Sequence, residues 1–373
     1  MSTTNDFLPI KAIDHIEFYV GNAKQAAFFY AHGMGFANTG YSGLETGSRD
    51  TASYVMEQGR IRFVLTTPLG PDQRIARQLH LHGDGVGVVA LEVPDAEAAY
   101  RETTKRGATG AIQPTEVSDE YGLLRYSAIH AYGDTLIKFV DRSQYNGVFA
   151  PGFREVPGSP RSMNGKPGHK GVGLAAIDHM VGNVELGAMN RWVKFFAETM
   201  GFSQLIHFDD QDISTEYSAL MSKVMQDGTG KVKFPINEPA EGKKRSQIQE
   251  YLDFYYGPGI QHIALSTGDI IQTVSTLQDN GIQFLRVPQA YYDQLADRVG
   301  NIDEPIEELA RLGILVDRDE EGYLLQIFSK PVEDRPTVFY EVIERHGSRG
   351  FGKGNFKALF ESIEREQALR GNL

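Results

Sequence analysis

The segment AIDHMVGN at residues 176–183 repeats, almost unchanged, a stretch near the start of the chain, where residues 12–15 read AIDH and residues 20–22 read VGN. Two further matches follow in the same order: FF at residues 28–29 and 195–196, and MGF at residues 34–36 and 200–202. Each copy has the pattern of a short strand carrying a histidine, a Gly-Asn turn and an amphipathic helix. The chain therefore consists of two halves built on one plan.

The composition is that of a folded globular protein with room for two domains. The chain has 373 residues, of which 41% are hydrophobic and 23% charged. Its net charge of −12, with no basic run, argues against a nucleic-acid or membrane-surface partner. No cysteine is present, so any metal must be held by histidine and carboxylate side chains. The polar N-terminus and the lack of a long apolar run favour a cytoplasmic protein.

Hydrophobic patterns predict strands with short helices, and hence an α+β fold, in each half. In the first half we expect a strand at residues 12–20, a helix at 22–32 and a hairpin of two strands within 51–66. His80 and His82 lie in a polar segment that we expect to be a surface loop.

A run rich in Pro, Gly and Ser at residues 151–173 predicts a linker between the halves. At the other end of the chain, the glycines within residues 350–354 predict a hinge. It precedes a helix at 355–368 that carries Phe356, Leu359, Phe360 and Ile363 on one face. Such a helix is either a lid over a site or a terminal helix docked permanently on the body.

The two halves differ at positions that matter for chemistry. Both keep the histidine of the AIDH segment. When the later strands are aligned, His262 in the second half stands against Val88 in the first, and Glu341 stands against Phe139. The second half alone therefore offers two imidazoles and a carboxylate on three strands.

These three residues, His179, His262 and Glu341, match the facial triad of non-haem iron(II) sites, with manganese and zinc as alternatives. A carboxylate on an apolar strand is costly unless it is paired or ligated. A single histidine on an apolar strand is more often a hydrogen-bonded core residue, and we interpret His15 in that way.

Three neutral amides lie on otherwise apolar segments of the second half and suit recognition of a phenol or a carboxylate. Asn237 lies in PINEP at residues 235–239, which we expect to form a rigid turn. Gln247 lies at the start of a helix, and Gln326 shares one face of a strand with Phe328. Hydrogen bonds within the fold are the alternative role of each amide.

Seven short motifs together resemble the 4-hydroxyphenylpyruvate dioxygenase family of the vicinal-oxygen-chelate superfamily, over the chain from about residue 11 to its end. They are AIDH at 176–179, PINEP at 235–239, KRSQIQ at 244–249, QHIAL at 261–265, LLQIF at 324–328, FYE at 339–341 and GFGKGNF at 350–356. The resemblance implies two tandem domains, each of paired βαβββ modules that form an open barrel, plus a C-terminal helix.

The resemblance also implies a division of the chain. We expect a degenerate N-terminal domain without metal at residues 12–142, the linker at 151–173, a catalytic domain at 175–346 and a lid helix at 347–373.

Carried over position by position, the resemblance assigns one Fe(II) per chain to His179, His262 and Glu341. It assigns Asn237, Gln247 and Gln326 to catalysis. It places eight residues around the substrate: Ser222, Asn237, Gln247, Gln261, Gln326, Phe328, Phe351 and Phe356. Simple strand alternation, by contrast, points Gln261 away from the face of His262.

The reaction that the resemblance implies converts 4-hydroxyphenylpyruvate and O2 to homogentisate and CO2 in tyrosine and phenylalanine catabolism, by oxidative decarboxylation, ring hydroxylation and side-chain migration. The alternative is 4-hydroxymandelate synthase, which shares the fold, iron and substrate. A ring-cleaving extradiol dioxygenase would not explain the glutamine-rich pocket, and a metal-free ligand-sequestering protein would not need the triad. The resemblance further implies a homodimer or homotetramer.

Overall fold

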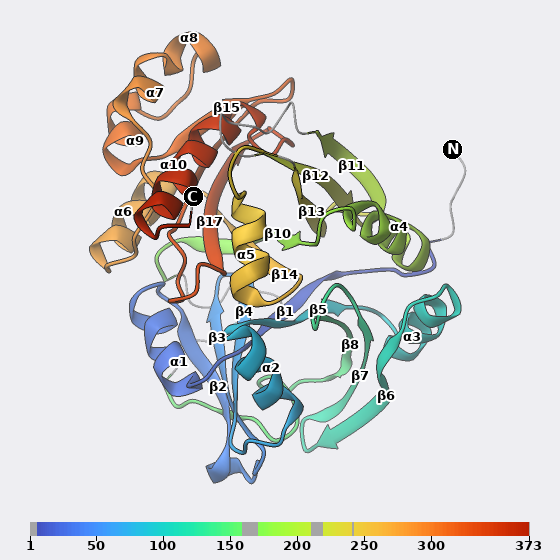
Figure 1. Cartoon of the computed structure of the whole chain (residues 1–373). Coiled ribbons are helices and arrows are strands. Elements are labelled where there is room, and N and C mark those ends of the chain that lie inside the picture. The colour runs from blue at the N-terminus through green and yellow to red at the C-terminus, as the bar shows by residue number, and fades with distance from the viewer. Residues whose placement is uncertain (1–5, 159–170, 210–218, 241, 373) are drawn as a thin grey trace.

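Two curled sheets, one from each half of the chain, form the frame of the molecule (Figure 1). The structure is a computed structural model that describes residues 6–158, 171–209, 219–240 and 242–372. The middle of the predicted linker, residues 159–170, lies outside these ranges. Helices flank the strands of both sheets, which confirms the predicted α+β fold.

The N-terminal sheet has the strand order β6-β7-β8-β5-β1-β4-β3-β2-β9. Its strands are β1 (Ala12–Tyr19), β2 (Ala37–Ser42), β3 (Thr51–Gln58), β4 (Ile61–Pro68), β5 (Gly85–Glu92), β6 (Gly110–Asp119), β7 (Gly122–His130), β8 (Leu136–Tyr145) and β9 (Arg154–Glu155). Its helices are α1 (Ala23–His32), α2 (Arg74–His82), α3 (Ala96–Lys105) and the short 3-10 helix η1 (Leu44–Thr46). β9 lies in the segment predicted as linker, yet it pairs with β2.

The C-terminal sheet has the order β11-β12-β13-β10-β14-β17-β16-β15. Its strands are β10 (Leu174–Asn183), β11 (Ser203–Phe208), β12 (Ala219–Gln226), β13 (Lys233–Ala240), β14 (Gly259–Thr267), β15 (Leu315–Arg318), β16 (Tyr323–Phe328) and β17 (Phe339–His346). Its helices are α4 (Met189–Met200), α5 (Gln247–Tyr255), α6 (Ile270–Asp279), α7 (Gln289–Asp293), α8 (Leu295–Val299), α9 (Ile306–Leu312), η2 (Lys353–Asn355) and α10 (Phe356–Leu369). No helix of the described ranges is both long and apolar enough to cross a bilayer.

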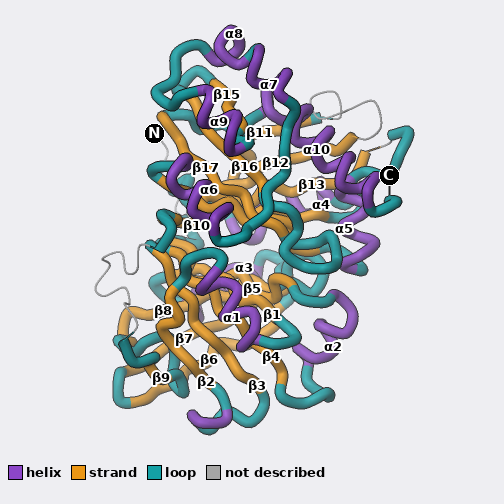
Figure 2. Tube along the Cα trace, turned by 90° about the vertical axis from the view of Figure 1, so that its left-hand side faces the viewer, coloured by secondary structure: helices purple, strands orange, loops and turns teal. Residues whose placement is uncertain are grey.

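Each sheet is made of two βαβββ modules, as predicted. Within a module the first and last strands pair in parallel: β1 with β4, β5 with β8, β10 with β13, and β14 with β17. The modules of one sheet meet through an antiparallel pair, β1 with β5 and β10 with β14. The fourth module carries an insertion that the sequence did not predict, the helices α7 to α9. Figure 2 shows α7 and α8 at the end of the molecule farthest from the N-terminal sheet.

Several helices begin where the sequence supplies a capping side chain. Asn22, Asp95, Ser246 and Asp269 each accept a hydrogen bond from a backbone N–H of the first turn of α1, α3, α5 and α6. The caps at Asn22 and Ser246 confirm the helix starts predicted at residues 22 and 247. The cap at Ser246 also fixes the start of α5, whose first residue is Gln247.

The PINEP segment at residues 235–239 is part of strand β13, so the prediction of a turn is wrong. The carbonyl oxygen of Asn237 accepts a hydrogen bond from Val184 N on the β10 side. The backbone N–H groups of every second residue point to the same side of a strand. Pro235 and Pro239, which have no N–H group, therefore also lack a donor on the β10 side. The β10–β13 ladder is only two residue pairs long, whereas the antiparallel ladder with β12 remains continuous.

The segment with His80 and His82 is helix α2, so the prediction of a loop is also wrong. His80 is exposed, as expected, but His82 is buried. His82 Nδ1 donates to the carbonyl oxygen of Tyr255, its Nε2 lies 2.8 Å from Asp134 Oδ2, and its ring stacks on Tyr255. His82 therefore joins helix α2 of the first half to helix α5 of the second.

The two halves share one continuous cluster of buried apolar side chains. At its centre the hydroxyl groups of Tyr30 in α1 and Tyr340 in β17 lie 2.6 Å apart. The ring of Tyr340 also stacks on Phe63 of β4, with centroids 6.1 Å apart. Strand β17 is thus packed against the N-terminal half.

Candidate metal centre and adjoining pocket

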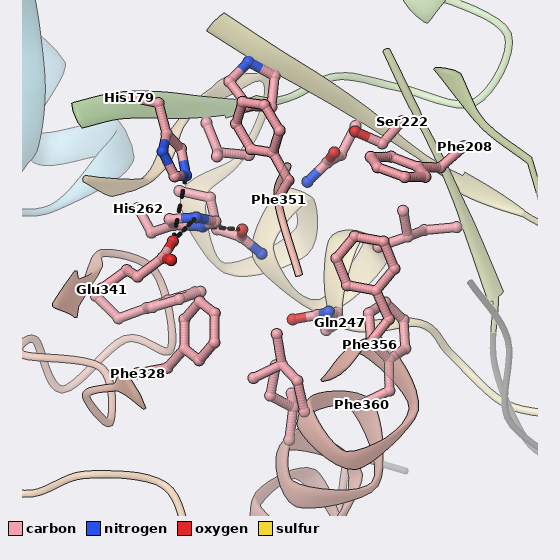
Figure 3. Close-up of a pocket in the computed structure, with 18 of the residues that line it drawn as sticks. His179, Phe208, Ser222, Gln247, His262, Phe328, Glu341, Phe351, Phe356 and Phe360 are labelled. Atoms are coloured by element: carbon pink, nitrogen blue, oxygen red, sulfur yellow. Dashed lines mark hydrogen bonds and ion pairs between the residues drawn. The ribbon is translucent and has the colours of Figure 1, made fainter. Parts of the chain in front are cut away.

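Three neighbouring strands of the C-terminal sheet carry the predicted metal ligands: His179 on β10, His262 on β14 and Glu341 on β17. Ala264 of β14 pairs with His179 on one side and with Glu341 on the other. His262 lies two residues before Ala264, so its side chain has the same direction. The strand register therefore brings all three side chains to one face of the sheet (Figure 3).

The three donor atoms converge. His179 Nε2 lies 3.2 Å and His262 Nε2 lies 3.6 Å from Glu341 Oε2. Ligand atoms of one transition-metal ion lie about 2.0–2.2 Å from the ion, which places neighbouring ligands roughly 3 Å apart. His179 and Glu341 are each only 3% exposed. The spacing, the burial and the donor types all fit a divalent ion held by these residues.

An aspartate and an arginine hold the first histidine. His179 Nδ1 lies 2.8 Å from Asp178 Oδ1, and Arg345 donates two hydrogen bonds of 2.8 Å to the same carboxylate. Asp178 reaches its neighbour because β10 has a bulge between residues 177 and 179 in its pairing with β14. Because Nδ1 is engaged, Nε2 is the nitrogen that faces the centre.

A second bulge explains the position of Gln261. The pairing of β10 with β14 passes from His262 to Ile260 and leaves Gln261 as the additional residue. Its Oε1 lies 2.9 Å from His262 Nδ1, and its side chain lines the same pocket as His262. Simple alternation fails here because alternate residues face opposite sides only in a regular strand.

The charges of the centre suit metal ligation. Burial alone would raise the pKa of Glu341, but the neighbouring histidines lower it to about 2. Burial alone would lower the pKa of His179, yet Glu341 and Asp178 raise it. For His262 burial dominates and lowers the pKa. Glu341 is therefore anionic and His262 neutral at neutral pH, the states in which these groups ligate metals.

The N-terminal sheet has the same arrangement without the ligands. Val88 pairs with Glu17 as His262 pairs with Val181, so the prediction that Val88 stands in the place of His262 is confirmed.

Lys138, rather than Phe139, occupies the position of Glu341, so that prediction is wrong by one residue. Lys138 pairs with Ala90 as Glu341 pairs with Ala264. Phe139 is fully buried in the hydrophobic core, because a shift of one residue along a strand moves a side chain to the other face. The N-terminal half therefore has a cation where the C-terminal half has the ligand carboxylate.

The groups that hold the histidine are present in both halves. Asp14 contacts Nδ1 of the buried His15 and accepts two hydrogen bonds from Arg142. These contacts repeat those among residues 178, 179 and 345. His15 is thus a hydrogen-bonded core residue, as we predicted from the sequence.

A pocket adjoins the three ligands. Its polar wall consists of Ser222, Asn237, Gln247 and Gln261. Its apolar wall consists of Val181, Phe208, Leu220, Val224, Pro235, Phe328, Phe339, Phe351, Phe356, Leu359, Phe360 and Ile363. In Figure 3 the rings of Phe328 and Phe351 lie beside the ligand group and those of Phe356 and Phe360 lie across the pocket from it, so a flat apolar ligand can lie next to the centre.

Helix α10 closes one side of the pocket with the apolar face that the sequence predicted. Its inner end is formed by Phe356 and Phe360 (Figure 3). Its outer end is tied to α5 by Arg370, which donates a 2.8 Å hydrogen bond to Glu250 Oε2. Ser362 Oγ donates to the carbonyl oxygen of Arg286. The helix therefore covers the pocket and is anchored at its middle and at its C-terminal end.

Seven of the eight predicted substrate contacts line the pocket, and Gln326 does not. Gln326 is 1% exposed and packs against Gly352, whose φ is +75°. Its Oε1 has no hydrogen-bond partner in the part of the chain that the structure describes. Gln326 thus shares a face of β16 with Phe328, as predicted, but lies behind the pocket wall.

The sequence interpretation missed two groups of residues. Asp178 and Arg345 position His179, and the repeated Asp-His pair at residues 14–15 was a signal that could have found the first of them. Phe208 and Phe339 line the pocket, but their sequence surroundings do not distinguish them from core aromatic residues.

Comparison with known proteins supports the same interpretation. Residues 5–152 match the family model described as hydroxyphenylpyruvate dioxygenase, N-terminal, and residues 176–327 match the model of the glyoxalase, bleomycin resistance protein and dioxygenase superfamily. The 4-hydroxyphenylpyruvate dioxygenase of Yarrowia lipolytica is 45% identical, over 99% of this chain and 95% of the relative. That of Dictyostelium discoideum is 46% identical, over 98% and 100%. A solved mutant of 4-hydroxymandelate synthase from Streptomyces coelicolor has a TM-score of 0.86 at 30% identity, over 96% of this chain and 100% of that chain.

Proposed function

Because this chain belongs to the 4-hydroxyphenylpyruvate dioxygenase family, we propose that it converts 4-hydroxyphenylpyruvate and O2 to homogentisate and CO2. The observation that carries the proposal is the convergence of two imidazoles and one carboxylate beside an aromatic pocket. The identity to dioxygenase relatives, 45–46% over nearly the whole chain, exceeds the 30% identity to the synthase.

In this proposal one Fe(II) per chain is held by His179, His262 and Glu341. Two nitrogen donors and one oxygen donor leave open positions on the ion, which is the ligand set of iron(II) oxygenases. When bound, the ion would supply redox chemistry with O2 and coordination positions for the α-keto acid of the substrate. The protein holds these donors in place through Asp178 and Gln261, which engage the outer imidazole nitrogens.

The pocket residues orient the substrate. With its α-keto acid at the ligand group, the phenol ring of the substrate extends along the aromatic wall formed by Phe328, Phe351 and Phe356. The paired residues Ser222 and Asn237 supply polar groups from adjacent strands. These contacts fix which ring carbon faces the reacting centre, and the apolar wall keeps water from it.

We assign catalytic roles to Asn237, Gln247 and Gln326. Gln247 and Asn237 present neutral amides to the pocket. Gln326 lies behind the wall, so its role requires either a different side-chain rotamer or action through Gly352.

We also propose the domain division expected from the sequence: residues 12–142, a linker at 151–173, a catalytic domain at 175–346 and a covering helix at 347–373. The proposed context is tyrosine and phenylalanine catabolism in the cytoplasm, as a homodimer or homotetramer. Light scattering of the purified protein tests the oligomeric state.

The test is anaerobic loading with Fe(II), addition of 4-hydroxyphenylpyruvate and then air, followed by chromatography of the products. We expect homogentisate and one CO2 for each substrate consumed. If 4-hydroxymandelate forms instead, the metal ligands stand but the ring-hydroxylating assignment is wrong. If neither product forms although iron is bound, the assignment of the substrate is wrong.

Two variants make this test specific. Glu341→Gln keeps the size of the side chain and removes the anionic ligand, so we expect loss of bound iron and of both products. Glu308→Gln, on α9, changes a carboxylate whose side chain is 44% exposed and does not line the pocket, and it should behave as the wild type. Iron binding by Glu341→Gln at wild-type affinity would contradict the ligand assignment.

A further inference from the structure

A second group of metal-ligating side chains lies on the opposite face of strand β17. Glu344 and His346 alternate with Glu341 along this strand, so they point away from the pocket. Glu304, in the loop between α8 and α9, meets them there. This group, Glu304, Glu344 and His346, shares no residue with the centre described above.

The donor atoms of this group are spaced like those of the first centre. His346 Nε2 lies 3.1 Å from Glu304 Oε1 and 3.2 Å from Glu344 Oε1. All three ligand atoms lie within 4.8 Å of one another. A distance of roughly 3 Å between donors is the separation that one ion of the zinc type imposes. The side chains of Glu304 and Glu344 are only 13% and 11% exposed.

The surroundings orient these donors as the neighbours of metal ligands do. Glu344 Oε2 accepts a 2.7 Å hydrogen bond from Ile270 N at the start of α6, which leaves Oε1 for a cation. The ring of Tyr323 stacks on His346, with centroids 4.4 Å apart and the planes 5° from parallel. Both supporting contacts come from other elements, so the group does not depend on one flexible loop.

The group is not satisfied by protein contacts alone. Glu304 Oε2 is buried and has no hydrogen-bond partner in the described ranges. Within those ranges neither glutamate pairs with a lysine or an arginine, and His346 Nε2 lies within 3.2 Å of an oxygen of both. One imidazole Nε2 carries a single hydrogen, so it can make a full hydrogen bond to only one of the two Oε1 atoms. A positive charge at the point where the three side chains meet would compensate the charge of the two carboxylates.

We propose that Glu304, Glu344 and His346 bind a second divalent cation, of the zinc class, with water completing its coordination. The donor set of one imidazole and two carboxylates suits a borderline first-row ion better than calcium or magnesium, which prefer oxygen alone. The ion would tie the loop before α9 to β17, three residues from Glu341. Its role is to fasten the inserted helices α7 to α9 to the sheet.

The test is the number of zinc ions retained by the full-length protein. The protein is stripped with a chelator, dialysed against micromolar Zn²⁺ and analysed by elemental mass spectrometry. We expect His346→Gln and Glu304→Gln each to bind one equivalent less than the wild type. His130→Gln, at an exposed position on β7, removes a histidine elsewhere and should retain the wild-type number. Circular dichroism establishes that each variant is folded.

The readout is a difference of one equivalent, so it does not depend on whether the first centre takes zinc or on which reaction the protein catalyses. Zinc should also raise the unfolding temperature of the wild type by more than that of His346→Gln. If both variants retain the wild-type number of ions, the proposal is wrong and the three side chains form a cluster without an ion.

Discussion

Replacement of Asp178 by asparagine separates metal positioning from stability, because the N-terminal half contains the same contacts without the metal ligands. Asp178→Asn keeps the shape of the side chain but removes its charge. The imidazole of His179 then loses an anionic partner, a change that lowers metal affinity by about 10- to 100-fold in comparable sites. The same substitution leaves the guanidinium of Arg345, 19% exposed, without its carboxylate. Breaking a buried pair in this way costs about 3–5 kcal/mol, and we expect roughly 3 kcal/mol because the arginine is partly exposed.

Asp14→Asn is the matched control. Asp14 makes the same contacts to His15 and to Arg142, which is 17% exposed, and it also lies 3.6 Å from Arg62, so the loss of stability should be at least as large. No metal ligand is involved, so the affinity for iron should stay at the wild-type value. Urea unfolding measures the first quantity, and anaerobic competition with a chromogenic iron(II) chelator measures the second.

The outcome is decided by the pair of variants together. If Asp14→Asn weakens iron binding as much as Asp178→Asn does, the effect arises from general destabilisation and the positioning role is refuted. Equal iron affinity in Asp178→Asn and the wild type would refute it as well. The pKa of Asp178 is lowered in the folded protein, so its stabilising contribution is present above the ordinary aspartate pKa of about 4 and is lost as the pH falls. The stability difference between wild type and Asp178→Asn should therefore shrink in acid.

Three further predictions concern other parts of the fold. Burial raises the pKa of Glu333 to about 7, so the contribution of this side chain to folding stability is complete below pH 4.5 and is lost as the pH rises through 7. Glu333→Gln should therefore be more stable than the wild type by roughly 1–2 kcal/mol at pH 8, but not at pH 5. Urea titrations at the two pH values measure this difference. The double variant Val88→His with Lys138→Glu should bind one metal ion more than the wild type in equilibrium dialysis, whereas Val88→His alone should not, because the lysine remains beside the new imidazole. Gly352→Ala should lower the free energy of unfolding by about 1–3 kcal/mol, since φ is +75° and the new Cβ would lie 2.4 Å from Gln326 Oε1; an unchanged urea midpoint would contradict this.

The local elements and the three ligands could be predicted from the sequence because their signals are local or repeated. Helix starts follow from caps such as Asn22 and Asp95, whose hydrogen bonds involve only the next few residues. His262 could be identified because the repeat supplies an internal comparison with Val88. The same comparison named Phe139 instead of Lys138, because a sequence alignment of two strands contains no information on their pairing with a third.

The remaining features depend on contacts between strands, which local sequence does not encode. Gln261 faces the pocket because of a bulge that only the pairing of β14 with β10 defines. Pro235 and Pro239 suggest a turn locally, but their missing N–H groups face the side of β13 where the ladder is short. Helices α7 to α9 have no counterpart in the first half, so the repeat could not reveal them.

The hydroxyl contact between Tyr30 and Tyr340 bears on how the duplicated chain could be divided. A gene for residues 171–372 alone would encode all three proposed ligands. Yet Tyr340 immediately precedes Glu341, and its ring and hydroxyl group rest on Phe63 and Tyr30 of the first half. Such a fragment would keep the pairing of β17 with β14 and β16, but it would expose this buried tyrosine and remove the packing surface beneath it. The half without the metal ligands therefore contributes to the other half by packing against the strand that carries one of them.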